Sequence, residues 1–292
     1  MANAGIGCER CAPFGGRGYR LETDRDRTDP HSHVVVCECV APHCVCGALQ
    51  PLRRLAAEAV PAYGDLAARA DEAMDEQKCP CWQVRRHAER LDHLLRLAQV
   101  PELYEGKLMG DYRIAHQGAA IPGAELALAQ AQTWVEKIVS GDEVRSLYLS
   151  GPPGSGKTLL ASIALTELIL HTARPGLFVK LSLGYFQRLR ATYDDQPGGE
   201  RASQVIARLS AVPHLVLDDL GAERGSAWEI EWLYNLIDAR YQKRRPVIIT
   251  SNHSIEDLRE LSRGRVASRL RHMSLAVKTP ERDLRELFSY GQ

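Results

Sequence analysis

The chain has 292 residues, 45% of them hydrophobic, which is enough to bury the core of one domain and of a smaller second one. Its 37 basic residues balance its 37 acidic residues, which excludes nucleic-acid binding through overall charge and leaves only a local patch. No apolar run reaches the length of a membrane span, and the first residues lack the basic-then-apolar pattern of a signal segment. We therefore expect a cytoplasmic protein without a membrane anchor.

The cysteines are confined to the first part of the chain, where all eight precede residue 82. In a cytoplasmic protein, cysteines in close pairs favour metal binding over disulfides. Two thiolates from one turn can approach a tetrahedral zinc ion together, so four pairs could fill two four-thiolate sites. An iron–sulfur cluster and reduced free thiols are the alternatives. The pairs are Cys8/Cys11, Cys37/Cys39, Cys44/Cys46 and Cys79/Cys81.

Residues 1–100 contain few large apolar side chains, so a metal ion would act there as a structural staple. We expect this region to be a small Cys-rich, zinc-binding module with helical segments. Pro101 and the glycines between 118 and 123 predict a linker over residues 101–123, because Pro and Gly interrupt regular structure. A second domain then spans residues 124–292 and begins with a predicted helix, Ala124–Val139.

The strongest motif follows an apolar strand, Leu147–Leu149, and precedes a predicted helix, Leu159–Leu170. Its glycines let consecutive N–H groups turn inward toward an anion, and the helix adds the positive end of its dipole. Lys157 can reach the β- and γ-phosphates of a nucleotide, and the Thr158 hydroxyl can hold Mg²⁺. A glycine-rich turn that matches by chance is the alternative, but the strand–loop–helix context favours a nucleoside triphosphate site. The motif consists of Gly151, Pro152, Pro153, Gly154, Ser155, Gly156, Lys157 and Thr158.

Beyond this motif, apolar strands alternate with amphipathic helices. The alternation predicts an α/β fold, a mostly parallel sheet with helices on both faces and a ligand at the carboxyl ends of the strands. The predicted strands are 177–181, 214–220, 247–251 and 275–278. The predicted helices are 183–193, 201–209, 227–244, 254–261 (capped by Ser254), 265–272 and 281–288, with a turn-rich loop at 194–199.

Two of these strands end in polar residues that suit hydrolysis. Asp218, at the end of an apolar strand, is the expected Mg²⁺ ligand, and Asp219 is the expected base or water-polarising group. Asn252, after the next strand, could orient the attacking water, and Thr250 and Ser251 are weaker candidates. The alternative interpretation is that both strands simply run into ordinary polar turns.

Four arginines fall within nine residues, and a solvated basic helix face is the usual meaning of such a run. The functional interpretation is an arginine finger, a guanidinium that one subunit supplies to the nucleotide of a neighbouring subunit. We choose Arg269 for that role. The four are Arg263, Arg265, Arg269 and Arg271.

Together these motifs resemble the DnaC/DnaI helicase-loader family of AAA+ ATPases and its transposition relative IstB, over about residues 79–290. The segments Leu215–Glu223 and Glu231–Tyr241 are similar to the signature that follows the Walker-B strand in that branch. The acidic pair in this chain, Asp218-Asp219, is Asp-Asp as is characteristic of that branch, whereas many AAA+ proteins have Asp-Glu. Thr250–Asn252 resembles sensor 1, and Arg265–Leu270 resembles the motif that carries the arginine finger.

The resemblance implies a P-loop NTPase fold that binds ATP and hydrolyses it with Mg²⁺. It also implies a homo-oligomer that works with a replicative helicase and single-stranded DNA during DNA replication. Asp283-Leu-Arg285 is similar to the end of the family's last motif, so Arg285 could act toward the γ-phosphate; a surface arginine is the alternative. Because the chain stops seven residues after Arg285, we expect the lid of the ATPase domain to be reduced or absent.

The predicted helix 183–193 occupies the position where the loader and initiator branch carries an insertion that binds single strands. Arg188 and Arg190 could pair with phosphates, and Tyr185 or Phe186 could stack on a base. The alternative is an amphipathic helix that buries Phe186 and Leu189 in the core.

Loader relatives often have a Cys-x-x-Cys pair, a Gly-rich turn and then a Cys-x-Cys pair before an Arg-rich helix. This pattern would join Cys8 and Cys11 to Cys79 and Cys81, but here about seventy residues separate the two halves. Cys37/Cys39 could instead complete the first site, which would leave Cys44/Cys46 with Cys79/Cys81. The possible substitutes are His31, His33 and His43.

Rival functions share most of these residues. A transposition helper that acts on duplex DNA with a transposase would need nearly the same ATPase site, although the Cys-rich front favours a loader. A switch that binds ATP without hydrolysis fits poorly with Asp218, Asp219 and Asn252. A metabolic kinase would need an acceptor-substrate motif, and we find none.

Overall fold

The computed structural model describes residues 8–9, 11, 17–22, 32–44, 49, 79–181, 186, 202–221 and 226–288. The chain divides into two compact units, Met1–Arg96 and Leu97–Gln292. Within the described part of the chain, none of the helices has the length and hydropathy that a membrane span needs.

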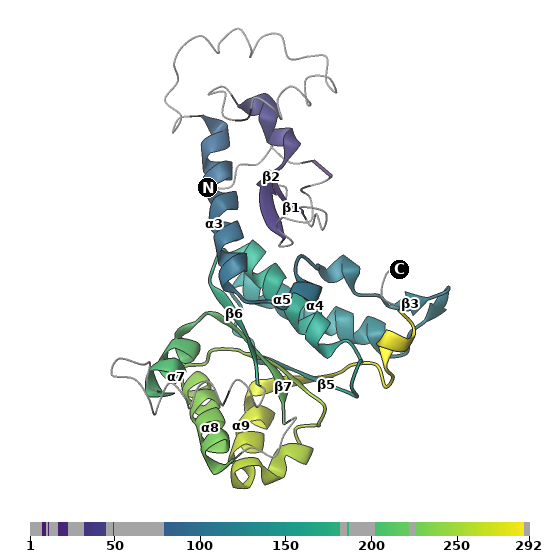
Figure 1. Ribbon diagram of the computed structural model, residues 1–292, viewed down its shortest axis with the longest axis vertical. Coiled ribbons are helices and arrows are strands. Elements are labelled where there is room, and N and C mark those ends of the chain that lie inside the picture. Colours follow the sequence, from purple (N-terminus) through teal and green to yellow (C-terminus); the bar gives the residue numbers. More distant parts are fainter. Residues whose placement is uncertain are drawn as a thin grey trace. The chain divides into compact units, whose positions relative to one another are not determined.

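The first unit combines a small sheet with a helix (Figure 1). Strands β1 (Tyr19–Glu22) and β2 (His33–Val36) are antiparallel, and a 3-10 helix, Glu38–His43, follows them. Helix α3 spans Pro80–Leu97. Its buried Asp92 accepts the backbone N–H of Val34 at 3.0 Å and pairs with Arg96, so this carboxylate ties α3 to β2.

The segment predicted as a linker contains short regular elements. It holds two 3-10 turns, Glu102–Tyr104 and Met109–Asp111, and a hairpin of β3 (Ala115–His116) and β4 (Ala119–Ala120). Helix α4 (Ala124–Ser140) follows; its C-terminal cap, Gly141, has a φ of 85°, the left-handed region in which glycine is favoured.

The second unit is built on a five-stranded parallel sheet in the order β6-β7-β8-β5-β9. Strand β5 pairs with β8 on one side and with β9 on the other, so the strand order reverses there, which is where such sheets bind ligands. This confirms the predicted α/β fold with a parallel sheet. The strands are β5 (Ser146–Ser150), β6 (Gly176–Lys180), β7 (His214–Leu220), β8 (Ile248–Ser251) and β9 (Ser274–Lys278).

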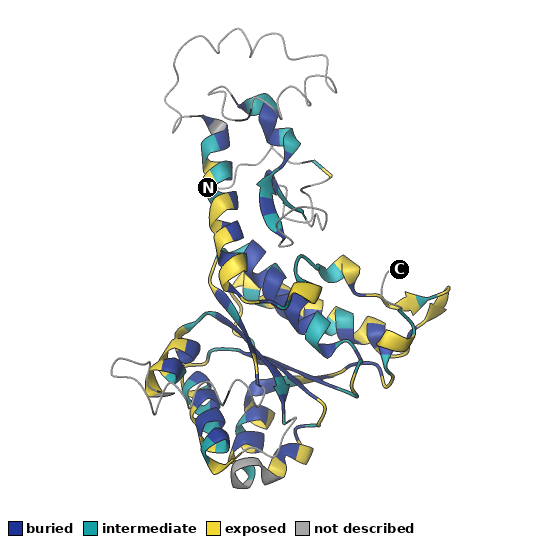
Figure 2. Cartoon of the chain, viewed as in Figure 1, coloured by how far each residue is buried: buried dark blue, intermediate teal, exposed yellow. Residues whose placement is uncertain are grey.

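Helices cover both faces of the sheet (Figure 1). Helix α5 (Lys157–Thr172) packs on the sheet with α4 beside it, and helices α7 (Ala202–Ala211), α8 (Ala227–Gln242) and α9 (Arg265–Met273) cover the other face. Figure 2 shows the buried residues along the strands and on the helix sides that face them. The sheet is therefore enclosed between two layers of helices.

Two predicted helices differ from the structure. Residues 254–261 were expected to be α-helical, but Asp257–Gly264 form a 3-10 helix in which Arg259 N–H bonds the carbonyl of Glu256, three residues back. Over residues 281–288 there is only one 3-10 turn, Leu284–Glu286. An α-helix there would bond the N–H of Leu284 to the residue 280 carbonyl, but this N–H is bonded to Gly154 instead.

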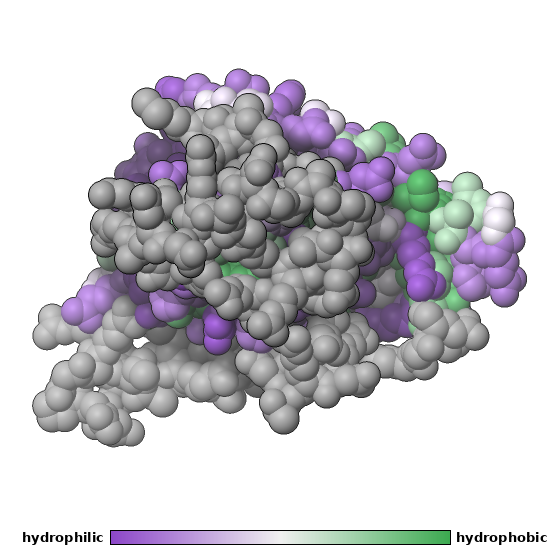
Figure 3. Space-filling model, turned by 90° about the horizontal axis from the view of Figure 1, so that it is seen from above, coloured by the Kyte–Doolittle hydropathy of each residue, from purple (hydrophilic) through white to green (hydrophobic). Residues whose placement is uncertain are grey.

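Hydrophilic side chains prevail among the described residues on the face shown in Figure 3, and hydrophobic ones gather on the side where Figure 1 places β3. A few exposed large apolar side chains are normal for a folded protein and identify no site by themselves. The large ones are Leu97, Leu103, Ile114, Leu126 and Val139.

Candidate nucleotide site

The glycine-rich loop connects β5 directly to α5, as predicted for residues 151–158. Gly154 and Gly156 have φ values of 73° and 87°, which only glycine adopts without strain. A Cβ on Gly154 would lie 1.8 Å from Oδ1 of Asp283, so the loop could not hold its path with a larger residue. Because the loop opens the first turn of α5, its amides and the helix dipole form an anion cradle that fits a triphosphate.

Lys157 lies within this cradle and is only 7% exposed. Its ammonium donates to the carbonyls of Gly151 at 2.8 Å and Pro152 at 2.7 Å. Burial lowers the pKa of Lys157, and the carboxylates of Asp219 and Asp218 act in the opposite direction. The lysine therefore lies within electrostatic reach of both predicted acidic residues.

Asp218 is 3% exposed and is held by two hydroxyl groups from neighbouring elements. Thr158 at the start of α5 donates to its Oδ1 at 3.0 Å, and Thr250 of β8 donates to the same oxygen at 2.7 Å. Burial raises the pKa of Asp218, and the two hydroxyl donors partly offset that rise. A buried carboxylate beside a threonine hydroxyl is a donor set that fits Mg²⁺, which prefers oxygen ligands.

Asp219 follows at an irregularity of the sheet. The register between β7 and β8 shifts between Leu217 and Leu220, and Asp219 has a φ of 69°. Its N–H donates to the Thr250 hydroxyl at 2.8 Å. A bulge with a non-glycine residue in the left-handed region is typical of a strand that re-aims a side chain at a functional site.

Thr250 thus contacts both aspartates, although sequence reasoning ranked it below Asn252. Ser251 donates to the carbonyl of Leu220 at 2.6 Å and so braces the end of β7. Asn252 follows β8 and is exposed, and it makes no side-chain hydrogen bond with another described residue. The structure therefore brings Asp218, Asp219 and Thr250 together, whereas Asn252 follows β8 without a side-chain hydrogen bond to the described residues.

The segment after β9 lies on the glycine-rich loop. Thr279 and Ser155 share a hydrogen bond between their hydroxyls at 2.7 Å, and the N–H of Leu284 donates to the Gly154 carbonyl at 2.9 Å. Arg285 is exposed, and its charge lowers the pKa of Lys157, so it stands near the cradle. The position is compatible with the expected contact with the γ-phosphate.

Sequence reasoning missed Tyr112, which comes from the predicted linker. A Cβ on Gly156 would lie 3.2 Å from the Tyr112 hydroxyl, and Tyr112 is 3% exposed. Burial raises its pKa to about 12, and the hydroxyl has no hydrogen-bond partner among the described residues. A large aromatic residue within a Gly-rich, polar stretch was the one available signal.

Arg269, the predicted finger, contacts α8. Its Nε pairs with Asp238, and its guanidinium carbon lies 4.6 Å from the ring centre of Tyr234. Arg265 lies over the same ring at 4.3 Å. Asp238 binds the guanidinium through Nε, and Nη1 donates to the Arg265 carbonyl at 3.5 Å, so Nη2 is the nitrogen best placed to reach an external phosphate.

The predicted DNA contacts, Arg188 and Arg190, lie outside the described residues, as does Tyr185. Phe186 is described and packs edge-on against Trp232 with the ring centres 5.6 Å apart. For Phe186 the structure therefore shows the core packing that was the alternative to base stacking.

The cysteines of the first unit form two groups. Cys8, Cys11, Cys37 and Cys39 make up one, and Cys44, Cys79 and Cys81 the other; Cys46 lies outside the described residues. Of the histidines proposed as substitutes, His33 and His43 are in neither group: His33 lies 3.3 Å from Asp92, and His43 ends a 3-10 helix. His31 lies outside the described residues.

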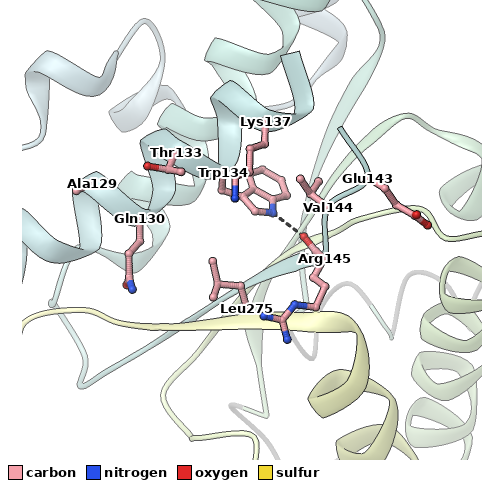
Figure 4. Close-up of a pocket in the computed structure, with 9 residues that line it drawn as sticks. All are labelled: Ala129, Gln130, Thr133, Trp134, Lys137, Glu143, Val144, Arg145 and Leu275. Carbon is pink, nitrogen blue, oxygen red and sulfur yellow. Dashed lines mark hydrogen bonds between the residues drawn. The ribbon is translucent and has the colours of Figure 1, made fainter. Parts of the chain in front are cut away.

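A cavity of about 410 Å³ lies away from the glycine-rich loop (Figure 4). It is lined by α4, by residues 143–145 before β5 and by Leu275 of β9. Trp134 forms part of its wall and donates through Nε1 to the Arg145 carbonyl at 2.6 Å. Because the cavity adjoins the start of β5 and the loop follows the end of that strand, the two are separate sites.

Comparison with known proteins supports this interpretation. A family model described as IstB-like ATP binding protein matches residues 55–271. The uncharacterized protein YdaV of Escherichia coli (strain K12) is 26% identical over 225 residues, which cover 76% of this chain and 86% of YdaV. The replicative helicase loader DnaC of the same strain is 25% identical over 184 residues, which cover 63% of this chain and 71% of DnaC.

A crystal structure of the DnaC helicase loader shares 25% sequence identity with this chain at a TM-score of 0.52. It covers 61% of this chain and 98% of the DnaC chain. The family match contains the glycine-rich loop and the chain from there to Arg271, within α9. The resemblance found in the sequence is thereby confirmed, and the chain belongs to the family of IstB-like ATP-binding proteins, P-loop ATPases of the AAA+ type to which the DnaC loaders are related.

Proposed function

We propose that this protein is a Mg²⁺-dependent ATPase that loads a replicative helicase onto single-stranded DNA. One observation carries the catalytic part of the proposal: the Thr158 hydroxyl at the start of α5 lies 3.0 Å from the Asp218 carboxylate at the end of β7. This contact joins the phosphate cradle to the acidic strand, as a nucleotide–magnesium site requires.

In the proposed reaction the loop amides and Lys157 bind the β- and γ-phosphates. To do so, the ammonium exchanges its bonds to the Gly151 and Pro152 carbonyls for phosphate oxygens. Thr158 and Asp218 would hold Mg²⁺, which when bound supplies positive charge to the terminal phosphates. Asp219 accepts a proton from the attacking water or polarises it, Asn252 orients that water, and Arg285 approaches the γ-phosphate from the segment after β9.

We further propose that ATP is hydrolysed between subunits of a homo-oligomer, with Arg269 as the finger. Asp238 holds its Nε, Tyr234 packs on its face and the Arg265 carbonyl accepts from Nη1, which leaves Nη2 for a neighbour's γ-phosphate. A finger that is already ordered loses less side-chain entropy when it reaches the transition state.

The helicase partner is proposed from the relationship to proteins named replicative helicase loaders. The single-strand contacts, Arg188 and Arg190, are proposed from the sequence alone, and a loader of this kind would act in the cytoplasm. For the N-terminal unit we propose that the cysteines bind zinc as a structural ion, because their thiols lie together in groups.

A transposition helper remains the second candidate, because the matching family model is named after IstB. Pull-downs from the source cell with tagged protein, in ATP and in ADP, separate the two: we expect the replicative helicase to be captured, whereas capture of a transposase would replace the loader proposal. Fluorescence anisotropy with matched single-stranded and duplex DNA gives a second comparison. The Arg188→Ala/Arg190→Ala variant should weaken single-strand binding, with Arg244→Ala, a substitution at the surface, as the matched control.

ATP binding and hydrolysis are tested separately. Lys157→Ala should abolish nucleotide binding in a titration, and intact binding would overturn the cradle assignment. Arg269→Ala should reduce hydrolysis only in the assembled form, again against Arg244→Ala. A rate that Arg269→Ala leaves unchanged would remove this residue as the finger.

A further inference from the structure

The first group of cysteines has the dimensions of a metal site. The Sγ–Sγ distances are 3.9 Å for Cys8–Cys11, 3.5 Å for Cys8–Cys37 and 3.7 Å for Cys11–Cys39. Four thiolates around a tetrahedral zinc ion at about 2.3 Å must lie about 3.8 Å from one another. A disulfide would need about 2.05 Å, so these sulfurs are positioned for a shared cation rather than for a bond to each other.

One backbone amide of this group donates to a sulfur, and the carbonyl of Cys8 lies 3.5 Å from the same sulfur, Sγ of Cys11. The N–H of Cys8 donates to Sγ of Cys11 at 3.3 Å, within a turn closed by the Cys11 N–H and the Cys8 carbonyl at 3.1 Å. A sulfur that accepts an amide proton is better suited to carry negative charge. Cys37 follows β2 directly, and its N–H bonds the Gly18 carbonyl at 2.8 Å, so the sheet fixes the opposite side of the group.

The second group joins different elements. Cys44 follows the 3-10 helix, and Cys79 and Cys81 lie at the start of α3, with their sulfurs 3.3 Å apart. All three are at most 2% exposed and belong to a small core with Val40 and Val84. Thiolates at a helix N-terminus are favoured by the dipole, and apolar surroundings shield a metal–sulfur site from water.

The two groups do not follow the pairing that the family pattern implies. That pattern would place Cys8 and Cys11 around one ion with Cys79 and Cys81, but the structure puts these two pairs in different groups. Cys37 and Cys39 complete the first group, and Cys44 joins the second.

We propose that the N-terminal unit binds two structural zinc ions, one in each group. Cys8, Cys11, Cys37 and Cys39 supply all four ligands of the first ion, and Cys44, Cys79 and Cys81 supply three ligands of the second. Each thiol that binds gives up its proton to solvent. The first ion links the turn at Cys8–Cys11 to the end of β2, and the second links the end of the 3-10 helix to the start of α3. The proposal specifies the zinc role proposed above and does not depend on ATP hydrolysis or on a helicase.

Native mass spectrometry of the full chain, prepared with Zn²⁺, counts the ions directly. We expect two per chain in the wild type, one in Cys37→Ser/Cys39→Ser and one in Cys79→Ser/Cys81→Ser. His43→Ala, a nearby possible ligand outside both groups, should keep two. The proposal would be overturned in favour of the family pairing by a single ion in the wild type. It would also be overturned if Cys37→Ser/Cys39→Ser bound as many ions as the wild type.

A second measurement on the wild type avoids variants that fail to fold. Stepwise chelation followed by thiol alkylation shows which cysteines lose protection together. We expect Cys8, Cys11, Cys37 and Cys39 to become labelled as one set, separately from Cys44, Cys79 and Cys81. Joint labelling of Cys8 and Cys11 with Cys79 and Cys81, ahead of the others, would refute the assignment. Because neither readout uses ATP, DNA or helicase, failure here leaves the proposed function standing, and the reverse also holds.

Discussion

Thr250 offers the sharpest test of what holds Asp218 and Asp219 in place at the end of β7. Thr250 is 1% exposed, and its hydroxyl donates to Asp218 at 2.7 Å and accepts the N–H of Asp219 at 2.8 Å. Thr250→Val keeps the shape of the side chain and removes both hydrogen bonds. Thr250→Ser keeps the hydroxyl and loses only a methyl group, so it is the matched control.

The expected loss can be worked out from these two contacts. A hydrogen bond to a charged group contributes about 1.5–3 kcal/mol, and a buried N–H left without a partner costs about 1–3 kcal/mol. Because neighbouring contacts are not additive, we expect Thr250→Val to lower the free energy of unfolding by about 3 kcal/mol relative to Thr250→Ser. The same change removes one of the two hydroxyls that lower the pKa of Asp218, so that pKa should rise further.

The rise in the pKa of Asp218 predicts how stability and ATP hydrolysis change with pH. Since the folded-state pKa of Asp218 already lies above its ordinary value, ionised Asp218 disfavours folding at neutral pH, and protonation relieves the cost. The stability gap between Thr250→Val and Thr250→Ser should therefore narrow as the pH falls through that pKa. If ionised Asp218 binds Mg²⁺, the acid limb of ATP hydrolysis should move to higher pH in Thr250→Val.

Urea unfolding at several pH values and a pH–rate profile check both expectations. If Thr250→Val unfolds within about 0.5 kcal/mol of Thr250→Ser and has the same acid limb, the Thr250 hydroxyl does not support the acidic strand.

Three other contacts give further predictions. Burial, together with the charges of Arg174 and Arg240, lowers the pKa of His214 to about 4, so its stabilising effect is present above pH 6.5 and is lost as the pH falls toward 4. Between pH 7 and pH 5 the wild type should lose about 2 kcal/mol relative to His214→Gln in urea unfolding, and parallel curves would contradict this. Arg240 is fully buried and donates to the carbonyls of Leu209, Val212, Pro213 and Pro246. Arg240→Met should therefore lower the free energy of unfolding by about 3 kcal/mol, well beyond the effect of Arg245→Met at a more exposed neighbour. Equal losses in the two variants would show that the buried hydrogen bonds of Arg240 add no extra stability. Asp238→Asn should lower hydrolysis in the assembled form about fivefold, as expected for loss of about 1 kcal/mol of ion pairing, and leave ATP binding unchanged. Full activity in Asp238→Asn beside a defect in Arg269→Ala would show that the ion pair does not position the guanidinium.

The sheet and the phosphate loop could be predicted because their signals are local. A parallel strand buried on both faces appears as a short apolar run, and β7 has the bounds expected from the sequence, His214–Leu220. The loop could be predicted because positive φ values at Gly154 and Gly156 require glycine at fixed spacing before a helix. Each of these features depends on a few consecutive residues.

Features that depend on distant residues could not be predicted in this way. Thr250 was ranked below Asn252 because both are polar residues at the end of one strand, and only the bulge at Asp219 decides which of them meets the acidic pair. Tyr112 reaches Gly156 across more than forty residues of sequence. Cysteine spacing likewise left the pairing of the thiols open, because any two close pairs can share a tetrahedral ion.

The turn at Leu284–Glu286 shows how a distant contact replaces a predicted element. Helical periodicity favours an α-helix over residues 281–288, but the N–H of Leu284 bonds the Gly154 carbonyl and Asp283 caps the short turn that follows. Since β9 lies next to β5 in the sheet, the residues after β9 emerge beside the loop that follows β5. Because β9 and β5 are parallel neighbours, both segments leave the sheet at the same edge, and this register brings the residues around Leu284 beside the glycine-rich loop.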